Sequence, residues 1–154
     1  MNMMVLNMWL NVTELGVDMS MPAGKYYIGD LCYVMTDDEW LEFCDITIRG
    51  TQVIDGEFQL KDGRRFATYG TAYGDGVYHD QYGHSYSVDA GLIGCIKIED
   101  IRANNYDNLL DLGSIMEFDN SFATSGGRGE TDWEGTIQFG HVMVETNPHY
   151  EEEY

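Results

Sequence analysis

Positive charge is scarce in this chain. Its 154 residues include 8 Lys and Arg against 27 Asp and Glu, a formal net charge of −19. Protein affinity for DNA and RNA depends on cations that displace counterions from the phosphates, so this composition argues against direct nucleic-acid binding. Anionic lipid headgroups would also repel such a surface, which argues against a membrane role. The charge predicts a basic partner instead.

Cysteine and long apolar runs are also scarce. Cys32, Cys44 and Cys95 are odd in number and contain no C-x-x-C pair, which excludes the usual signatures of a disulfide framework and of a thiolate zinc site. No apolar run approaches the roughly 20 residues of a membrane span. The amino-terminal segment lacks the basic region of a secretory signal, because the first basic residue is Lys25. We therefore expect a cytoplasmic protein with reduced thiols.

Familiar catalytic motifs are missing as well. The chain has neither a Gly-x-Ser-x-Gly elbow nor a Gly-x-x-x-x-Gly-Lys-Ser/Thr phosphate loop. Cys32 lies next to Asp30 in an acidic chain, and this disfavours a reactive thiolate. His79 and His84 flank a turn and are expected on one face, but two ligands do not make a metal site. We assign no catalytic residue, cofactor or metal.

Apolar residues are abundant despite the charge. They make up 44% of the chain and aromatic residues 13%, which is too apolar for a disordered acidic chain. A domain of this length buries roughly 70% of its unfolded surface. We predict one compact β-rich domain over residues 1–146 and an acidic carboxy-terminal tail over residues 147–154.

Strand patterns outnumber helix patterns. The sequence predicts an α+β fold with a mostly antiparallel sheet or barrel-like meander and one or two short helices. Turn dipeptides such as Asp55-Gly56 and Asp62-Gly63 separate several strands. The predicted strands are Lys25–Ile28, Leu31–Met35, Gln52–Ile54, Glu57–Leu60, Arg65–Thr68, Val77–His79, His84–Val88, the central Leu92–Ile98, Ser114–Phe118 and the segment Thr136–Glu145.

The clearest helix begins after Thr36. Thr36 and Glu39 have the spacing of a capping box, and the acids of the first turn suit the helix dipole. Trp40 and Phe43 give the helix an apolar side that predicts packing on a sheet. A second short helix is predicted over Asp100–Leu112.

A Gly-Asp-x-x-Tyr pattern occurs twice, at Gly29-Asp30 and at Gly74-Asp75. The simpler interpretation is a pair of shaped turns in one sheet, and the alternative puts both aspartates at the lip of one pocket. With Cys32-Tyr33 and the stretch 89–94, these segments resemble small bacterial and phage domains that carry a G-D-P-C-Y-like strand and a downstream Y-G-D-G-x-Y turn. Leu31 stands where those domains have proline. The resemblance implies a β-rich module of bacterial or phage origin and no particular activity.

The distribution of acids yields the leading functional hypothesis. We predict a non-enzymatic binding module that engages a basic protein surface, such as that of a nucleic-acid-binding protein, in the manner of a phage-encoded inhibitor that mimics nucleic acid. A solvated acidic surface without a partner is the plain alternative. The predicted partner-binding residues are Asp37, Asp38, Glu39, Trp40, Glu42 and Asp45.

Two other functions are kept open. The first is a binder or sponge for a small anionic ligand such as a nucleotide, held by the Gly-rich loop and the β-core. Its predicted residues are Asp30, Tyr33, Asp75, Tyr78, Gly127 and Arg128. The second is a metal- or carboxylate-dependent hydrolase that would use Asp30, Asp75 and His79.

Overall fold

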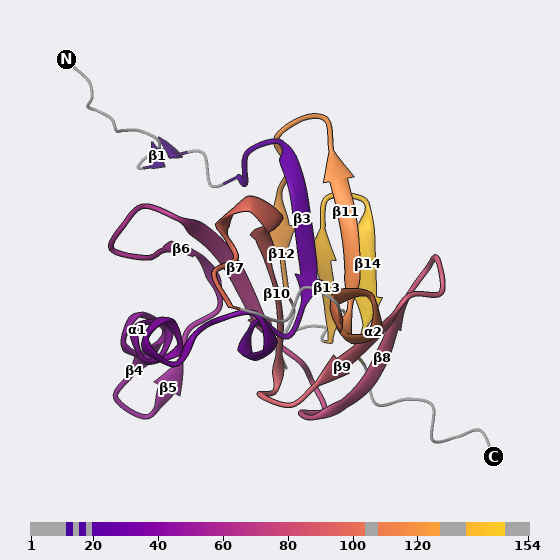
Figure 1. Ribbon diagram of the computed structural model, residues 1–154, viewed down its shortest axis with the longest axis horizontal. Coiled ribbons are helices and arrows are strands. Elements are labelled where there is room, and N and C mark those ends of the chain that lie inside the picture. Colours follow the sequence, from indigo (N-terminus) through magenta and orange to yellow (C-terminus); the bar gives the residue numbers. More distant parts are fainter. Residues whose placement is uncertain (1–11, 14–15, 18–19, 104–107, 127–134, 147–154) are drawn as a thin grey trace.

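Two five-stranded antiparallel sheets form the body of the protein, as the computed structural model shows (Figure 1). The structure describes residues 12–13, 16–17, 20–103, 108–126 and 135–146. Two small hairpins accompany the sheets, namely β1 (Val12–Thr13) with β2 (Gly16–Val17), and β4 (Ile48–Arg49) with β5 (Gln52–Val53). The predicted α+β class with antiparallel strands is confirmed, and the strands form two separate sheets.

The first sheet is built around a strand that is apolar on both faces. Its order is β11 (Ser114–Phe118), β3 (Gly24–Gly29), β10 (Leu92–Lys97), β7 (Arg65–Gly70) and β6 (Gly56–Gln59). The first five residues of β10 are buried, as expected for the continuous apolar run that predicted a central strand. Both faces of this sheet are therefore covered by other layers.

The second sheet covers one of those faces. Its order is β12 (Thr124–Ser125), β13 (Thr136–Phe139), β14 (Val142–Glu145), β8 (Gly76–Asp80) and β9 (Ser85–Val88). Alternate residues of the two sheets meet in one apolar layer, as in a β-sandwich. Its fully buried members include Tyr26, Ile28, Ala67, Tyr86, Ile93, Cys95, Ile137, Phe139, Val142 and Val144.

Helical segments cover the other face of the first sheet. They are η1 (Leu31–Tyr33), α1 (Asp37–Thr47), η2 (Ile98–Asp100) and α2 (Leu109–Leu112). Phe43 of α1 stacks toward Phe66 of β7, with ring centroids 5.2 Å apart. This second apolar layer also contains Tyr27, Leu31, Val34, Met35, Leu60, Leu92, Ile96, Ile101 and Leu109. The protein thus has three layers, a helical one and two sheets.

The predicted capping box of α1 is confirmed. The Thr36 hydroxyl accepts a hydrogen bond from Glu39 N at 3.2 Å, and Glu39 Oε1 accepts one from Thr36 N at 2.8 Å. The second predicted helix is shorter than expected, because the described part of Asp100–Leu112 is helical only at Asp100 in η2 and over α2.

One predicted strand and one predicted strand pairing are wrong. Leu31–Met35 was expected as a strand, but Leu31–Tyr33 is the helical turn η1 because the Asp30 side chain caps it by accepting from Cys32 N. Gln52–Ile54 was expected to pair with the strand after Asp55-Gly56, but β5 pairs with β4. Asp55 instead accepts a hydrogen bond from Gly70 N at 3.1 Å, which fixes the start of β6 against the end of β7.

The strands predicted on either side of Asp62-Gly63 do pair, as β6 with β7. The segment Thr136–Glu145 is a hairpin of β13 and β14 that turns at Gly140-His141. Among the helices that the structure describes, each is too short or too polar to span a bilayer. The predicted tail, residues 147–154, lies outside the described residues.

Candidate functional site

Asp30 is a buried structural clamp. Its carboxylate is fully buried and accepts three backbone hydrogen bonds, from Cys32 N at 3.0 Å and from Asp89 N and Ala90 N at 2.7 Å each. The first bond caps η1, and the other two join the end of β3 to the turn between β9 and β10. Because both oxygens are occupied by protein donors, Asp30 holds three segments together and has little capacity left for a ligand.

Asp75 approaches the same turn from the second sheet. Its Oδ1 lies 3.9 Å from the position that a Cβ atom on Gly91 would occupy. Gly74 adopts φ +80°, and its carbonyl accepts hydrogen bonds from Thr71 Oγ1 at 2.7 Å and from Tyr78 OH at 2.8 Å. The two Gly-Asp turns are therefore different in structure, although both adjoin residues 89–91.

Tyr33 and Cys32 also lie beside the turn at residues 89–91. The Tyr33 hydroxyl donates a hydrogen bond to Asp89 Oδ2. Burial raises the pKa of the Cys32 thiol, and the carboxylates of Asp30, Asp89 and Asp75 raise it further. A thiol in this state is a poor nucleophile, which agrees with the view of Cys32 as a structural residue.

The expectation that His79 and His84 share a face is wrong. In the observed register His79 lies opposite Ser85, and Asp80 N donates to His84 O, so the two imidazoles point to opposite faces of the β8–β9 hairpin. His84 Nδ1 lies 2.9 Å from Asp80 Oδ2. Among the described residues, no group of three His, Cys, Asp or Glu side chains is placed to hold a metal ion.

Asp80 is the second buried clamp. Its carboxylate accepts from Tyr82 N at 2.8 Å, from His84 N at 3.0 Å and from Tyr86 OH at 2.6 Å. Burial alone would raise its pKa, but these hydrogen bonds outweigh burial and hold the pKa of Asp80 below its ordinary value of 3.8. Asp80 therefore stabilises the hairpin turn as an ionised group.

Two of the predicted partner-binding acids on α1 serve the fold. Glu39 is 8% exposed, and besides its role in the capping box it forms an ion pair with Arg64. Arg64 also pairs with Asp62 at 2.9 Å and donates to the Asp100 carbonyl at 2.8 Å. Glu42 is partly buried and accepts a hydrogen bond from Lys61 N. Both carboxylates attach α1 to the loop between β6 and β7.

The other three acids on α1 are exposed. Asp37, Asp38 and Asp45 form none of the ion pairs found among the described residues. Asp38 and Asp45 are seven positions apart and therefore lie along one stripe of the helix. The chain has no Lys or Arg between Lys25 and Arg49, so no cation of α1 itself offsets this charge.

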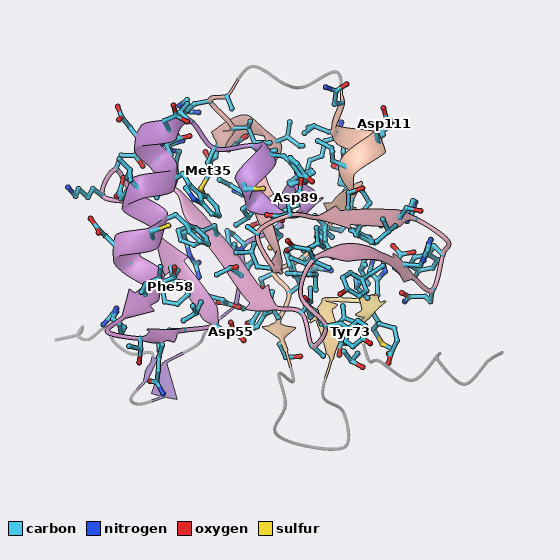
Figure 2. All side chains as sticks on the ribbon, turned by 90° about the horizontal axis from the view of Figure 1, so that it is seen from below. Met35, Asp55, Phe58, Tyr73, Asp89 and Asp111 are labelled. Carbon is cyan, nitrogen blue, oxygen red and sulfur yellow. The ribbon has the colours of Figure 1, made fainter. Side chains whose placement is uncertain are left out.

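Beside these acids the surface is hollowed. A pocket of about 350 Å³ lies between η1 and the first half of α1, and it is lined by Cys32, Met35, Asp37, Trp40 and Leu41. Leu41 is 66% exposed, whereas Trp40 is partly buried and stacks on Phe43 with ring centroids 4.6 Å apart and an interplanar angle of 8°. Figure 2 shows Met35 between α1 and the turn that contains Asp89.

We call this surface the α1 face and define it as Asp37, Asp38, Trp40, Leu41 and Asp45. It joins exposed carboxylates to an aromatic and an aliphatic side chain within two turns of one helix.

Comparison of the chain with models of protein families, with curated proteins and with solved structures found no match. The predicted resemblance to small bacterial and phage domains therefore stays a prediction. The α1 face and its pocket must be interpreted from their own chemistry.

The structure brings together the described residues that were predicted for an anionic ligand. Asp30, Tyr33 and Asp75 adjoin the turn at residues 89–91, and Tyr78 OH donates a hydrogen bond to the Gly74 carbonyl. Gly127 and Arg128 lie outside the described residues. The carboxylates near Cys32 would repel a nucleotide phosphate, so the described part of this set offers no favourable place for one.

Sequence reasoning missed Met35, Leu41 and Cys32 as parts of the pocket. A signal for Leu41 was available, because Asp37 and Leu41 are four positions apart on one side of the predicted helix. Cys32 and Met35 had no such signal, since they reach the pocket only because η1 turns the chain back beside α1.

Proposed function

We propose that the protein is a non-enzymatic binding module whose α1 face engages a basic surface of another protein. The observation that carries the proposal is that Asp37, Asp38 and Asp45 are exposed and form none of the ion pairs found among the described residues, on a helix whose first half lines an open pocket. Charges on a rim accelerate association, whereas an aromatic side chain in a pocket provides an anchor. The α1 face combines both.

The α1 acids divide into two groups, since among the described residues Glu39 and Glu42 attach α1 to the rest of the fold and the three exposed acids do not. Arg64 forms an ion pair with Glu39, and the backbone N–H of Lys61 donates to Glu42, whereas the exposed stripe lies outside these contacts. A chain with a net charge of −19 carries self-repulsion that destabilises the folded state. Attraction to a basic partner would offset part of that repulsion, which gives the exposed acids a physical use.

The chemistry of the partner follows from the charge. Nucleic-acid-binding proteins present grooves rich in Lys and Arg, and exposed carboxylates can occupy the positions of phosphates in such grooves. We therefore propose an inhibitor that competes with nucleic acid for its target. We place the interaction in the cytoplasm, where the three free cysteines would remain reduced.

The test is capture of proteins from a lysate of the source cells on the immobilised protein. We would compare wild type with Asp38→Lys/Asp45→Lys, which changes the net charge from −19 to −15 because each substitution adds two units. Asp111→Lys/Asp119→Lys is the matched control, since it makes the same change at exposed positions. Figure 2 shows that Asp111 lies on α2, at the opposite side of the molecule from α1.

The proposal predicts a basic protein that wild type and the control both capture, that the α1 variant captures poorly, and that duplex DNA displaces. Equal capture by all three proteins would show that the contact does not depend on the α1 face. Loss of capture by both variants would show that only net charge matters, and would leave the acidic surface without a defined binding face.

A further inference from the structure

The pocket beside Trp40 has one rigid aromatic wall. The Trp40 ring stacks on Phe43, which is 3% exposed and packs against Phe66 of the first sheet. The indole is therefore held against the core, and a side chain that enters the pocket meets a prepared surface. Prepared aromatic surfaces bind well because little conformational entropy is lost on contact.

The remaining walls combine apolar surface with negative charge. Met35 and Leu41 add a flexible thioether and an exposed aliphatic side chain, whereas Asp37 adds an exposed carboxylate. At the η1 side, three further carboxylates act on Cys32 and contribute to the raised pKa of its thiol. None of the described residues that line the pocket is a lysine or an arginine.

These properties define the kind of group that fits. A neutral apolar side chain would pack against Met35, Trp40 and Leu41 but would gain no electrostatic attraction from the nearby carboxylates. An ammonium group is strongly hydrated and offers no flat surface to an indole. A guanidinium is planar, stacks on aromatic faces and pairs with a carboxylate through two hydrogen bonds, and its aliphatic stem packs on apolar walls.

The pocket is large enough to admit a long side chain, which is smaller than a drug-sized ligand. Pockets for drug-sized ligands span roughly 300–1,000 Å³. At about 350 Å³ this pocket lies at the lower end of that range. Three of its lining residues, Asp37, Trp40 and Leu41, belong to the α1 face that is proposed to meet the partner.

We propose that this pocket receives an arginine side chain of the basic partner, with the guanidinium over the Trp40 indole and beside the Asp37 carboxylate. This inference rests on the proposed function and deepens it, because it names the residue type that the α1 face selects.

The experiment is a nuclear magnetic resonance titration of the ¹⁵N-labelled full chain with Nα-acetyl-arginine amide. The corresponding lysine amide and citrulline amide are matched probes, since citrulline has nearly the shape of arginine without its charge. The Trp40 indole signal is assigned with Trp40→Phe, because the chain also contains Trp9 and Trp133. We expect saturable shifts at the Trp40 indole and at the amides of residues 32–41, with affinity on the order of millimolar or weaker.

The probes and variants give graded results. Citrulline amide should bind at least about fivefold more weakly than arginine amide, and lysine amide about two- to fivefold more weakly. Asp37→Asn should weaken arginine amide binding about two- to fivefold. Asp111→Asn carries the same charge change at a remote exposed position and should leave it unchanged.

Two outcomes overturn the inference. One is the absence of a saturable shift at arginine amide concentrations up to the order of 0.1 M. The other is equal binding of arginine and citrulline amides, which would show that the pocket selects its ligand by shape and not by charge. Both leave the capture experiment with Asp38→Lys/Asp45→Lys untouched, so a failure of the pocket inference is distinguishable from a failure of the proposed function.

Discussion

Replacement of Asp30 by asparagine should destabilise the whole fold. Asp30 Oδ2 accepts from two amides of the turn between β9 and β10, and Oδ1 accepts from Cys32 N at 3.0 Å. An asparagine can direct its carbonyl oxygen to only one of these groups of donors. Its amide nitrogen would then face a backbone N–H, so a buried donor would lose its acceptor.

The magnitude follows from the number of bonds affected. Hydrogen bonds to a charged group contribute about 1.5–3 kcal/mol each, and a buried donor left unsatisfied costs about 1–3 kcal/mol. We expect Asp30→Asn to lower the free energy of unfolding by about 2–4 kcal/mol. With a urea m-value of about 2 kcal/mol/M, the midpoint of unfolding should fall by about 1–2 M.

The assay is urea unfolding followed by circular dichroism and tryptophan fluorescence. Asp75→Asn is the matched control, because Asp75 is exposed and belongs to the other Gly-Asp turn. It should change stability by no more than about 0.5 kcal/mol. If Asp30→Asn left the midpoint unchanged, Asp30 would not be the clamp that its three hydrogen bonds indicate.

Three further outcomes are expected. Thr36→Ala removes the acceptor for Glu39 N and should cost about 1 kcal/mol in urea unfolding, whereas Thr36→Ser keeps the cap. The folded pKa of Asp80 lies below its ordinary value of 3.8, so its stabilising effect is present above about pH 4 and is lost as the pH falls through the folded pKa. Wild type should therefore lose more stability than Asp80→Asn between neutral pH and acid. The raised pKa of Cys32 should make its thiol slow to alkylate in the folded protein at pH 8, as peptide mass spectrometry would measure.

Each of these has a clear contrary result. Equal stabilities of the alanine and serine variants would remove the capping role of Thr36. Parallel pH curves for wild type and Asp80→Asn would show that this carboxylate is not linked to folding. Alkylation of Cys32 as fast as that of a thiol in the unfolded chain would contradict its partly buried, negatively charged setting.

Local signals predicted those elements that depend on neighbours in the sequence. The cap of α1 needs only Thr36 and Glu39, three positions apart, and the β8–β9 hairpin forms around the turn at Asp80. The central place of β10 followed from its unbroken apolar run. In each case the stabilising contacts or the apolar pattern involve residues that are close together in the sequence.

Features that depend on distant partners were missed. Asp30 caps η1 through Cys32 N, but its carboxylate is also held by residues 59 and 60 positions away, which no local pattern reveals. The faces of His79 and His84 depended on which residues flank the turn, and a change of one position reverses the face. Glu39 has the pattern of an exposed acid on a helix, and only the fold brings Arg64 to it.

The candidate site shows the same division. Asp37, Asp38, Asp45 and Trp40 were predicted from the acidic helix. The pocket was not, because its η1 wall is placed by the Asp30 clamp.

The most direct test of the account measures association between the protein and a captured basic partner as a function of salt. For wild type and for Asp111→Lys/Asp119→Lys, the rate constant should be high at low salt and fall as salt is added, because salt screens exposed charges. For Asp38→Lys/Asp45→Lys it should be about tenfold lower at low salt and nearly independent of salt. The same rate and the same salt dependence for all three proteins would contradict a role for the α1 face in binding.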